Sequence, residues 1–578
     1  MKVQEKRCLH FMKVLDLTNL TKDEILILNE VAEEIREPFN TFVDFLANGQ
    51  EHNIDWIVSV LASRNIYIST LFFNCCRLGL IKRIIERGEM PDSIVTDSIA
   101  MKRVLDDYFS QNNILVNVYC SLSIFGRLKE RIVPLLRWVY WLYQSIYQYC
   151  FWNRLIHINY EFTNPIKLLD MFVLDNNFKD NDYIDRYYPG IWDYVSEEER
   201  KDFYYLPTCY QIQNLNRVGI EIKNSNQQFL IKEHFLRIQD YWFALCHPYR
   251  LLKYNFNVNY FLGFKMDYLV AEDILLNSCN YSSILAILNY LFVKRLKEEG
   301  IKVTLMIDWY ENQVNDRGLD VGFRKFYPDT WIVGYQGFIA PPLIHMKPSL
   351  LEYNSEQIPH EIMVVGKGLV QPVREFCPEL NVTVAPALRF KNVWRERIYF
   401  PENNTYTILV SLPIGLIEGN EILNLVFSAI YNKPLLNIRI LIKPHPTNSP
   451  TIVKRHYGKD WPDRLEIASG NFSECIERSD LLISNTSSTC METLAKGIPV
   501  IIIGSQSGLT QNPIPRNIED DIWTLCYTEE ELLQAILFYM DRDEEAIKRH
   551  EQTGRKIREM FFEPVTREGV RGFLNLED

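Results

Sequence analysis

The stretch from Ile438 to Gly504 constrains the fold of this chain more than any other part. It holds three short apolar runs that are typical of strands buried on both faces: Ile438 to Ile442, Leu481 to Ile483 and Pro499 to Ile503. Between the second and third runs, segment 487–496 is predicted to be a helix, because it begins with hydroxyl residues that can cap a helix and is followed by Gly497. Strands that alternate with helices build a parallel sheet, so the stretch predicts an α/β domain.

Polar residues follow two of these strands. Lys443-Pro444-His445-Pro446 follows the first, and Ser484-Asn485-Thr486-Ser487-Ser488 follows the second. Ligands of parallel sheets bind beyond the carboxyl ends of the strands, where a helix N-terminus offers free N–H groups and a positive dipole end. We therefore expect an anionic ligand at this corner. Ordinary helix capping also explains Ser487 and Ser488, and it leaves other N–H groups free for a phosphate.

These motifs and their spacing resemble the His-Pro and Ser-Ser/Thr motifs of bacterial GT-B glycosyltransferases that use CMP-activated acidic sugars, the sialyltransferases and Kdo transferases. Glu492 and the turn Gly497-Ile498-Pro499-Val500 match the wider GT-B pattern, in which such a glutamate often holds the nucleotide ribose. A second block, Asp308 to Gln313 with Gly334 to Phe338, looks like related surface-carbohydrate biosynthesis proteins.

The resemblance implies a GT-B-like α/β fold with two Rossmann-type lobes and a donor site in the second lobe. His445 would contact the CMP phosphate and assist departure of the nucleotide, with Lys443 as its charge partner or turned to solvent. No Asp-x-Asp follows a predicted strand, so we expect transfer without a metal or a cofactor beyond the CMP-sugar donor. The donor-binding residues implied are Lys443, His445, Pro446, Ser484, Asn485, Thr486, Ser487, Ser488 and Glu492.

An acceptor-side base is expected after the predicted strand Val303 to Ile307. Asp308 ends that strand and Glu311 follows three residues later, so both carboxylates are expected to face an interdomain cleft. Glu311 is the first candidate for the general base and Asp308 the second. Alternatively, Asp308 caps the loop and Glu311 pairs with Arg317 or Arg324. The acceptor hydroxyls would be held by Asn312, Gln313, Arg317, Tyr335 and Gln336.

Hydrophobic periodicity divides the chain into four parts. Residues 1–90 are predicted to be a helical N-terminal elaboration, and 91–345 an acceptor-side α/β lobe with an aromatic helical insertion. The proline-rich segment Pro341 to Pro359 is the expected linker to a nucleotide-sugar lobe, 360–555, which a tail, 556–578, follows. The GT-B resemblance would allow the charged helix Glu544 to Phe562 to cross back to the first lobe.

Composition narrows the class of protein. In 578 residues, 47% are hydrophobic and 24% charged, which is typical of a globular chain. The formal net charge of −12 disfavours a general nucleic-acid binder. Twelve cysteines lack C-x-x-C spacing, so reduced buried thiols are favoured. Met1 to Leu15 has no apolar signal-peptide core, and we expect a cytoplasmic protein.

The segment Ile132 to Trp152 is rich in aromatic residues but is interrupted by Arg137, Gln144 and Gln148. These interruptions favour a helix that packs against the rest of the protein. Contact of 127–154 with the inner face of the cytoplasmic membrane is the second alternative, and a spanning helix is the least favoured. The resemblance to CMP-sugar transferases implies transfer of a Kdo-like or nonulosonate sugar from a CMP donor onto a surface polysaccharide or lipid-linked glycan. The alternatives are a UDP- or GDP-hexose transferase and a non-catalytic glycan-assembly protein.

Overall fold

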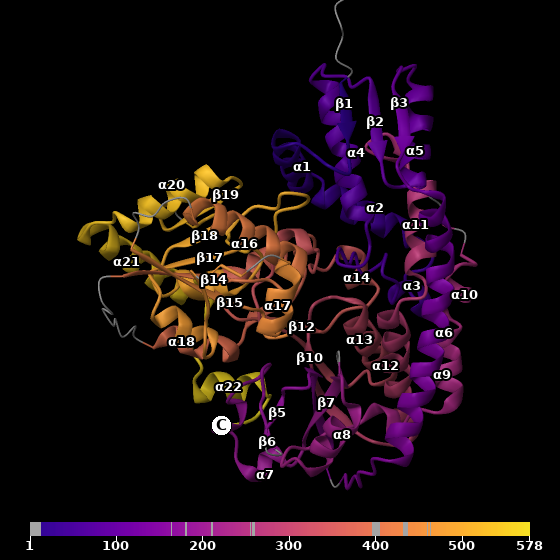
Figure 1. Ribbon diagram of the computed structural model, residues 1–578. Helices are drawn as coiled ribbons and strands as arrows, with labels where there is room; N and C mark the ends of the chain where they lie inside the picture. Colours follow the sequence, from indigo (N-terminus) through magenta and orange to yellow (C-terminus); the bar gives the residue numbers. More distant parts are fainter. Residues whose placement is uncertain are drawn as a thin grey trace, which may run out of the picture.

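The computed structural model describes residues 13–162, 164–179, 182–209, 212–254, 256, 260–395, 405–431, 437–458, 461–462, 464–518 and 520–577. The described chain forms two lobes, each built on a six-stranded sheet, and a third unit with a three-stranded sheet (Figure 1). Every strand pair in these three sheets is parallel. Two parallel sheets in separate lobes confirm the expected α/β class with two Rossmann-type lobes.

The first lobe has the strand order β13-β12-β11-β10-β4-β7. Helices α12 (Tyr281–Glu298) and α13 (Val314–Phe326) pack against each other and cover one face. Both faces of the sheet are buried, which explains why its strands are nearly continuous apolar runs. The strands are β4 (Ile166–Val173), β7 (Phe203–Cys209), β10 (Val303–Trp309), β11 (Trp331–Gln336), β12 (Glu361–Val364) and β13 (Val382–Val384).

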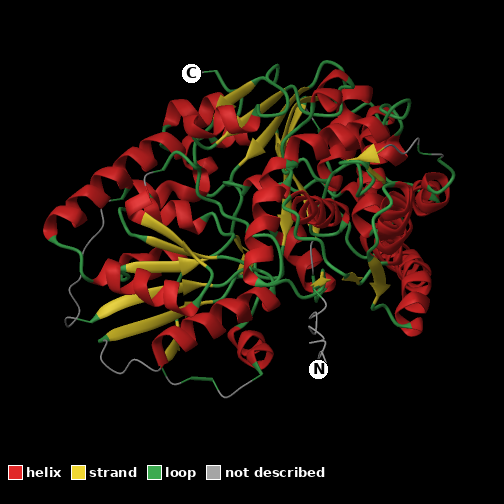
Figure 2. Ribbon diagram, turned by 90° about the horizontal axis from the view of Figure 1, so that it is seen from above, coloured by secondary structure: helices red, strands yellow, loops and turns green. Residues whose placement is uncertain are grey.

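The second lobe has the strand order β16-β15-β14-β17-β18-β19, with helices on both sides (Figure 2). One face is covered by α16 (Leu416–Tyr431), α17 (Pro450–Tyr457) and α20 (Glu529–Met540), and the other by α18 (Phe472–Glu477) and α19 (Thr489–Leu494). The strands are β14 (Tyr406–Ser411), β15 (Ile438–Lys443), β16 (Leu465–Ile467), β17 (Leu481–Ser484), β18 (Val500–Ile503) and β19 (Trp523–Cys526).

The N-terminal unit is larger than the helical region expected over 1–90. Strand β2 (Ser93–Thr96) pairs with β1 (Val14–Asp16) and β3 (Asn117–Cys120), and not with the first lobe. Its core also takes in a later segment that contains β8 (Tyr260–Phe261), β9 (Phe264–Lys265) and α11 (Asp267–Asn277). The helices before β3 are α1 (Lys22–Glu34), α2 (Arg36–Leu46), α3 (Ile54–Ile57), α4 (Leu71–Glu86) and α5 (Ile99–Gln111).

The boundary between the lobes lies later than expected. Strands β12 and β13 follow the proline-rich segment 341–359, yet they extend the first sheet beside β11. That segment is an ordered loop with the 3-10 turn η3 (Pro342–Ile344) and helix α14 (Leu350–Asn354), which Ser349 and Glu352 cap reciprocally. The lobes instead separate after β13, where the 3-10 helix η5 (Leu388–Trp394) begins.

The C-terminal helices cross from the second lobe back to the first, which the GT-B resemblance allowed for the charged helix at 544–562. Helix α21 (Glu544–Phe561) packs on α19, and Glu563 then donates its N–H to the Val365 carbonyl at 2.7 Å. Helix α22 (Arg567–Phe573) follows. The ring of Phe573, its last residue, has its centroid 4.9 Å from that of Tyr335 in the first lobe. One hydrophobic core therefore runs through both lobes.

The aromatic segment forms the single long helix α6 (Ile124–Arg154). One of its faces packs on α9 (Ile238–Leu245), where the Trp138 indole N–H donates to the Leu245 carbonyl at 2.8 Å. Among the described residues, no helix has both the length and the apolar character needed to cross a bilayer. The remaining helices of the first lobe are α7 (Glu197–Arg200), α8 (Leu215–Asn224), α10 (His247–Leu251) and α15 (Val370–Val373).

Candidate functional site

The two polar motifs lie at the same edge of the second sheet. Strand β14 pairs with β15 on one side and with β17 on the other, so the carboxyl ends of β15 and β17 flank that of β14. Ser484 is buried at the end of β17, and its hydroxyl donates to the Ser411 carbonyl of β14 at 3.1 Å. Ser484 therefore ties two strands together rather than facing a ligand.

His445 presents a neutral N–H donor at this edge. Its Nδ1 accepts the N–H of Thr447 at 3.3 Å and lies 2.8 Å from the Thr447 hydroxyl, which places the proton on Nε2. Burial lowers the pKa of His445 below its usual 6.5, and the charges of Arg389 and Arg186 lower it further. The imidazole is therefore uncharged at neutral pH.

Other residues of the predicted donor set are engaged locally. Lys443 donates to the Gly470 carbonyl, so it is neither the charge partner of His445 nor turned free to solvent. The Ser487 hydroxyl accepts from the Thr489 N–H at 3.3 Å and from the Thr489 hydroxyl at 2.8 Å, which is a capping role. The side chain of Ser488, the residue before α19, makes no capping bond. Thr486 and Asn485 bond to each other at 3.4 Å, and Pro446 is exposed.

Arg389 is the residue that connects the two halves of the site, and no sequence motif marked it. It lies on η5 between the lobes, with its guanidinium 5.4 Å from the ring centroid of Trp309. Its charge lowers the pKa of Glu311 in the first lobe and of His445 and Glu492 in the second, so it lies near all three. Its only sequence signal is that it is a cation shortly after a strand of the first lobe.

A second cation, Arg186, faces the same region from the first lobe. Burial is the main cause that lowers the pKa of its guanidinium, and the charge of Arg389 adds to this. Arg186 donates to the Asn176 carbonyl at 3.4 Å. Within the described ranges, neither guanidinium forms an ion pair with a carboxylate. Two cations without a direct ion pair among the described residues, beside a neutral N–H donor, make a site suited to an anion.

Glu311 has the surroundings of a base. Its side chain is partly exposed, and one carboxylate oxygen accepts the Trp309 indole N–H at 3.1 Å. Burial raises the pKa of Glu311, while the Trp309 bond and Arg389 oppose that rise. The alternative ion pairs are not formed, because Arg317 pairs with Glu352 and Arg324 donates to the Ile358 carbonyl at 3.2 Å.

Asp308 does not face a cleft. Its side chain is 0% exposed, and neither carboxyl oxygen receives an N–H or hydroxyl donor from the described residues. Asp170 on the neighbouring strand β4 lies close enough for its charge to help raise the pKa of Asp308. Burial, followed by the nearby Asp316 and Asp320, raises the pKa of Asp308 well above its usual range, and the pKa of Asp170 rises to about 7. Asp308 also does not cap the loop, because Asp316 accepts the N–H groups of Glu311 and Gln313.

Most predicted acceptor-side residues are structural. The Asn312 side chain is buried between Glu352, to which it donates at 3.4 Å, and Arg317, from which it accepts at 3.2 Å. Tyr335 is fully buried and donates to the Pro386 carbonyl at 2.8 Å. Gln313 precedes α13 as its N-cap residue, and Gln336 is buried. The sequence marks these residues only by their polarity, whereas Glu352 and Pro386, which bind Asn312 and Tyr335, lie 40 and 51 positions later in the chain.

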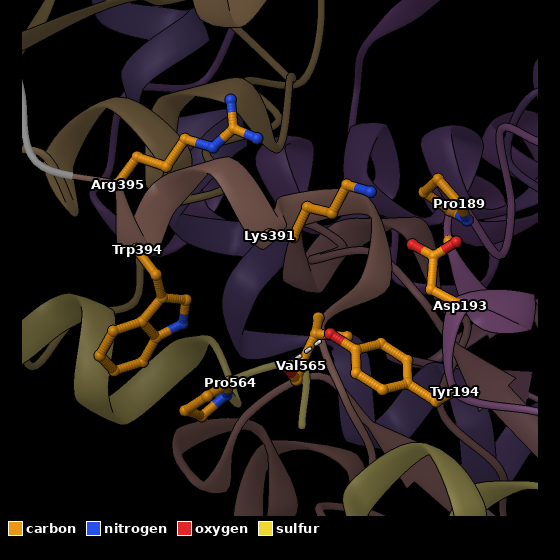
Figure 3. Close-up of a pocket in the computed structure, with 9 residues that line it drawn as sticks. Pro189, Asp193, Tyr194, Lys391, Trp394, Arg395, Pro564 and Val565 are labelled. Atoms are coloured by element: carbon orange, nitrogen blue, oxygen red, sulfur yellow. Dashed lines mark hydrogen bonds between the residues drawn. The ribbon is translucent and has the colours of Figure 1, made fainter. Parts of the chain in front are cut away.

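A cavity of about 280 Å³ opens beside this region (Figure 3). The Tyr194 hydroxyl donates to the Val565 carbonyl at 3.5 Å in its wall, which joins the first lobe to the crossing C-terminal segment. None of the predicted site residues lines it, although Lys391 belongs to the same 3-10 helix as Arg389. The lining residues are Pro189, Gly190, Asp193, Tyr194, Lys391, Trp394, Arg395, Pro564 and Val565.

Over the described part of the chain, no cluster of three or more His, Cys, Asp or Glu side chains is placed to hold a metal ion.

No protein-family model and no curated protein sequence matches the chain. Several solved structures are similar in fold. MnaA of S. aureus, solved with UDP, has a TM-score of 0.42 and 11% identity, with 71% of this chain and 98% of that chain covered. CalG4, the calicheamicin glycosyltransferase, has a TM-score of 0.38 and 11% identity, with 68% and 95% covered. UDP-GlcNAc 2-epimerase from Neisseria meningitidis, bound to UDP-GlcNAc, has a TM-score of 0.38 and 10% identity, with 67% and 94% covered.

Proposed function

We propose that the chain is a glycosyltransferase that moves an acidic sugar, Kdo-like or a nonulosonate, from a CMP donor onto a surface polysaccharide or lipid-linked glycan. The observation that carries this proposal is the position of Arg389 between the lobes. It lies near Glu311 on the first lobe and near His445 and Glu492 on the second. A base from one lobe and a donor clamp from the other thus flank the same cation.

The charges of the site support an acidic sugar. A CMP-linked acidic sugar carries one phosphate and one carboxylate, and the site offers two guanidiniums, Arg186 and Arg389, that lack carboxylate partners among the described residues. The Nε2–H of His445 adds a neutral donor. A diphosphate also carries two negative groups, so a UDP- or GDP-hexose is the second candidate donor.

The chemistry follows from these positions. Glu311 takes the proton of the acceptor hydroxyl, whose oxygen forms the new bond to the anomeric carbon. The bond from that carbon to the phosphate oxygen breaks, and CMP leaves with the electron pair. The guanidiniums and the His445 Nε2–H stabilise the charge that develops on the phosphate. In this proposal Glu492, which is buried in α19 with its pKa raised to about 7 mainly by burial, accepts a hydrogen bond from a ribose hydroxyl.

Calorimetric titration with CMP, UDP and GDP tests the proposal. We expect the wild type to bind CMP most tightly, and Arg389→Gln to lose about 1.5–3 kcal/mol of binding free energy because a charge-assisted hydrogen bond is removed. The matched control is Lys391→Gln, an exposed cation on the same 3-10 helix, which should bind as the wild type does. Tighter binding of UDP or GDP would favour the hexose transferase, and binding of none would favour a non-catalytic glycan-assembly protein.

A further inference from the structure

Helix α6 carries an apolar stripe on its solvent side. Exposed apolar residues recur along the helix at steps of three and four, which places them on one face. Phe125 is 85% exposed, and Leu135 is 62% exposed. At about 1.5 Å per residue, this 31-residue helix is about 46 Å long. The stripe consists of Phe125, Leu128, Ile132, Leu135, Val139 and Ile146.

The opposite face of α6 is already packed. Trp141 stacks on Tyr281 with ring centroids 4.3 Å apart, and Phe151 and Trp152 are buried in the first lobe. The helix is therefore apolar on both sides, and only one side is covered by the described chain. A helix with this character is normally buried all round, so the exposed stripe indicates a surface that covers it.

Further exposed aromatic residues lie on α6 and on the helices beside it. Next to the stripe on α6 are Tyr140, Tyr143 and Tyr147, all exposed. Helices α9 and α10 add exposed Trp242 and Tyr249, and these three helices lie along one edge of the molecule (Figure 1). Tyrosine and tryptophan are the residues that settle at the level of lipid headgroups, because their rings are apolar and their tips are polar.

The surface formed by α6, α9 and α10 is basic although the chain is acidic. Segment 124–154 contains five Lys or Arg residues and one acidic residue, whereas the whole chain has a formal net charge of −12. Lys129 and Arg137 are exposed on α6, and Lys253 lies 4.0 Å from the ring centroid of the exposed Tyr249. The charge of the surface is thus complementary to an anionic partner.

We propose that the surface formed by α6, α9 and α10 docks on a membrane of anionic phospholipid, with α6 lying in the plane of the interface. A second copy of the chain would bring a like-charged surface against this one in a symmetric dimer. A coiled-coil seam would also be flanked by charged side chains, whereas Leu136, Tyr140, Tyr143 and Tyr147 flank the stripe here. Apolar and aromatic residues together with surface cations are the combination that binds an anionic interface. The proposal is independent of the sugar donor.

Co-sedimentation of the full chain with vesicles tests the proposal. Vesicles of phosphatidylcholine alone are compared with vesicles of equal parts phosphatidylcholine and phosphatidylglycerol. We expect binding to the mixed vesicles that weakens as salt is added. The combined variant Leu135→Gln, Val139→Gln and Tyr143→Gln should lower the partition coefficient more than tenfold. Lys129→Gln, Arg137→Gln and Lys253→Gln should each lower it about fivefold.

The matched control is Ile414→Gln with Ile417→Gln and Phe538→Gln, three exposed apolar residues of the second lobe, which should bind as the wild type does. Circular dichroism and thermal unfolding verify that each variant is folded. A wild type that does not sediment with the mixed vesicles would overturn the proposal, as would equal loss of binding in the α6 variant and the control. The proposal would also be overturned if the wild type does not bind vesicles but forms a dimer in analytical ultracentrifugation, and the α6 variant does not form that dimer.

Discussion

Glu311 and Asp308 are three positions apart, yet their carboxyl groups have different surroundings. The Asp308 side chain points to the same side of β10 as Met306, toward the core shared with α12 and α13. Glu311 lies beyond the end of the strand, where its side chain is partly exposed near Arg389. Of these two carboxyl groups, only that of Glu311 is exposed enough to exchange a proton with a bound ligand, which makes it the better candidate for the base.

The base assignment predicts the effect of Glu311→Gln. The amide keeps the size of the side chain but cannot accept the proton, so turnover should fall by about 10²–10⁴ while CMP affinity stays nearly unchanged. In the wild type, kcat should rise with pH as Glu311 loses its proton. The raised pKa of Glu311 places this rise above the usual value of 4.5. Steady-state kinetics over a pH series, with calorimetry at one pH, measures both effects.

Asp308→Asn is expected to keep its activity and to gain stability. Folding favours the protonated form of Asp308 because burial raises its pKa well above 3.8, whereas the unfolded chain ionises it near that usual value. This carboxyl therefore costs stability as pH rises from about 4 toward its folded pKa, by about 1.4 kcal/mol per pH unit. The amide avoids the cost, so its gain in urea-unfolding free energy should grow with pH. A folded, CMP-binding but inactive variant would move the base to Asp308.

His445→Ala should weaken CMP binding by about 1.5–3 kcal/mol, the value of a hydrogen bond to a charged phosphate. Because its pKa is lowered below 6.5, the wild-type affinity should not change through titration of His445 between pH 7 and pH 8. Calorimetry at both pH values measures this, with the exposed His456 of α17 as the site of a control substitution. Equal affinities for His445→Ala and the wild type would remove His445 from the donor site.

At the scale of elements, local sequence pattern located the strands of the second lobe well. The apolar runs 438–442 and 481–483 became β15 (Ile438–Lys443) and β17 (Leu481–Ser484), because fully buried parallel strands need continuous apolar residues. The prolines of 341–359 were misleading, since that segment is fixed by bonds from Glu352 to distant arginines. Arg389 could not be predicted, because only the folded chain places it near His445, more than fifty positions later.

The crossing of α21 onto the first lobe depends on Gly366. A Cβ at this position would lie 2.2 Å from the backbone carbon of Phe561, the last residue of α21. Gly366→Ala should therefore lower the free energy of unfolding by about 1–3 kcal/mol, the usual cost of overpacking, and loosen the contact between the lobes. In the control Gly419→Ala, on α16, the added Cβ meets nothing within 4 Å and should stabilise by about 0.5–1 kcal/mol. Urea unfolding distinguishes these outcomes, and equal stabilities would show that α21 is free to shift.

At the scale of the whole molecule, a buried ionic cluster joins the N-terminal unit to the first lobe. Arg64 follows α3 of the N-terminal unit, and Arg317 lies on α13. Both pair with Glu352 of α14, and all three side chains are at most 4% exposed. Glu352 also accepts the Ser349 N–H at 2.8 Å. The segment expected to be the linker between the two lobes is therefore the segment that holds the N-terminal unit and the first lobe together.

Glu352→Gln should destabilise the protein by about 3–5 kcal/mol, because it leaves two buried guanidiniums without their shared carboxylate. The arginines and hydrogen bonds hold the pKa of Glu352 at about 2 against burial, compared with a usual value of 4.5. The depressed pKa means that this carboxylate stabilises the fold fully above pH 4.5 and loses about 3 kcal/mol as pH falls to about 2. Urea unfolding across this range should show the loss in the wild type and in the control Glu356→Gln, an exposed neighbour, but not in Glu352→Gln. If the acid-induced loss persists in Glu352→Gln, other carboxylates and not this cluster set the acid stability of the molecule.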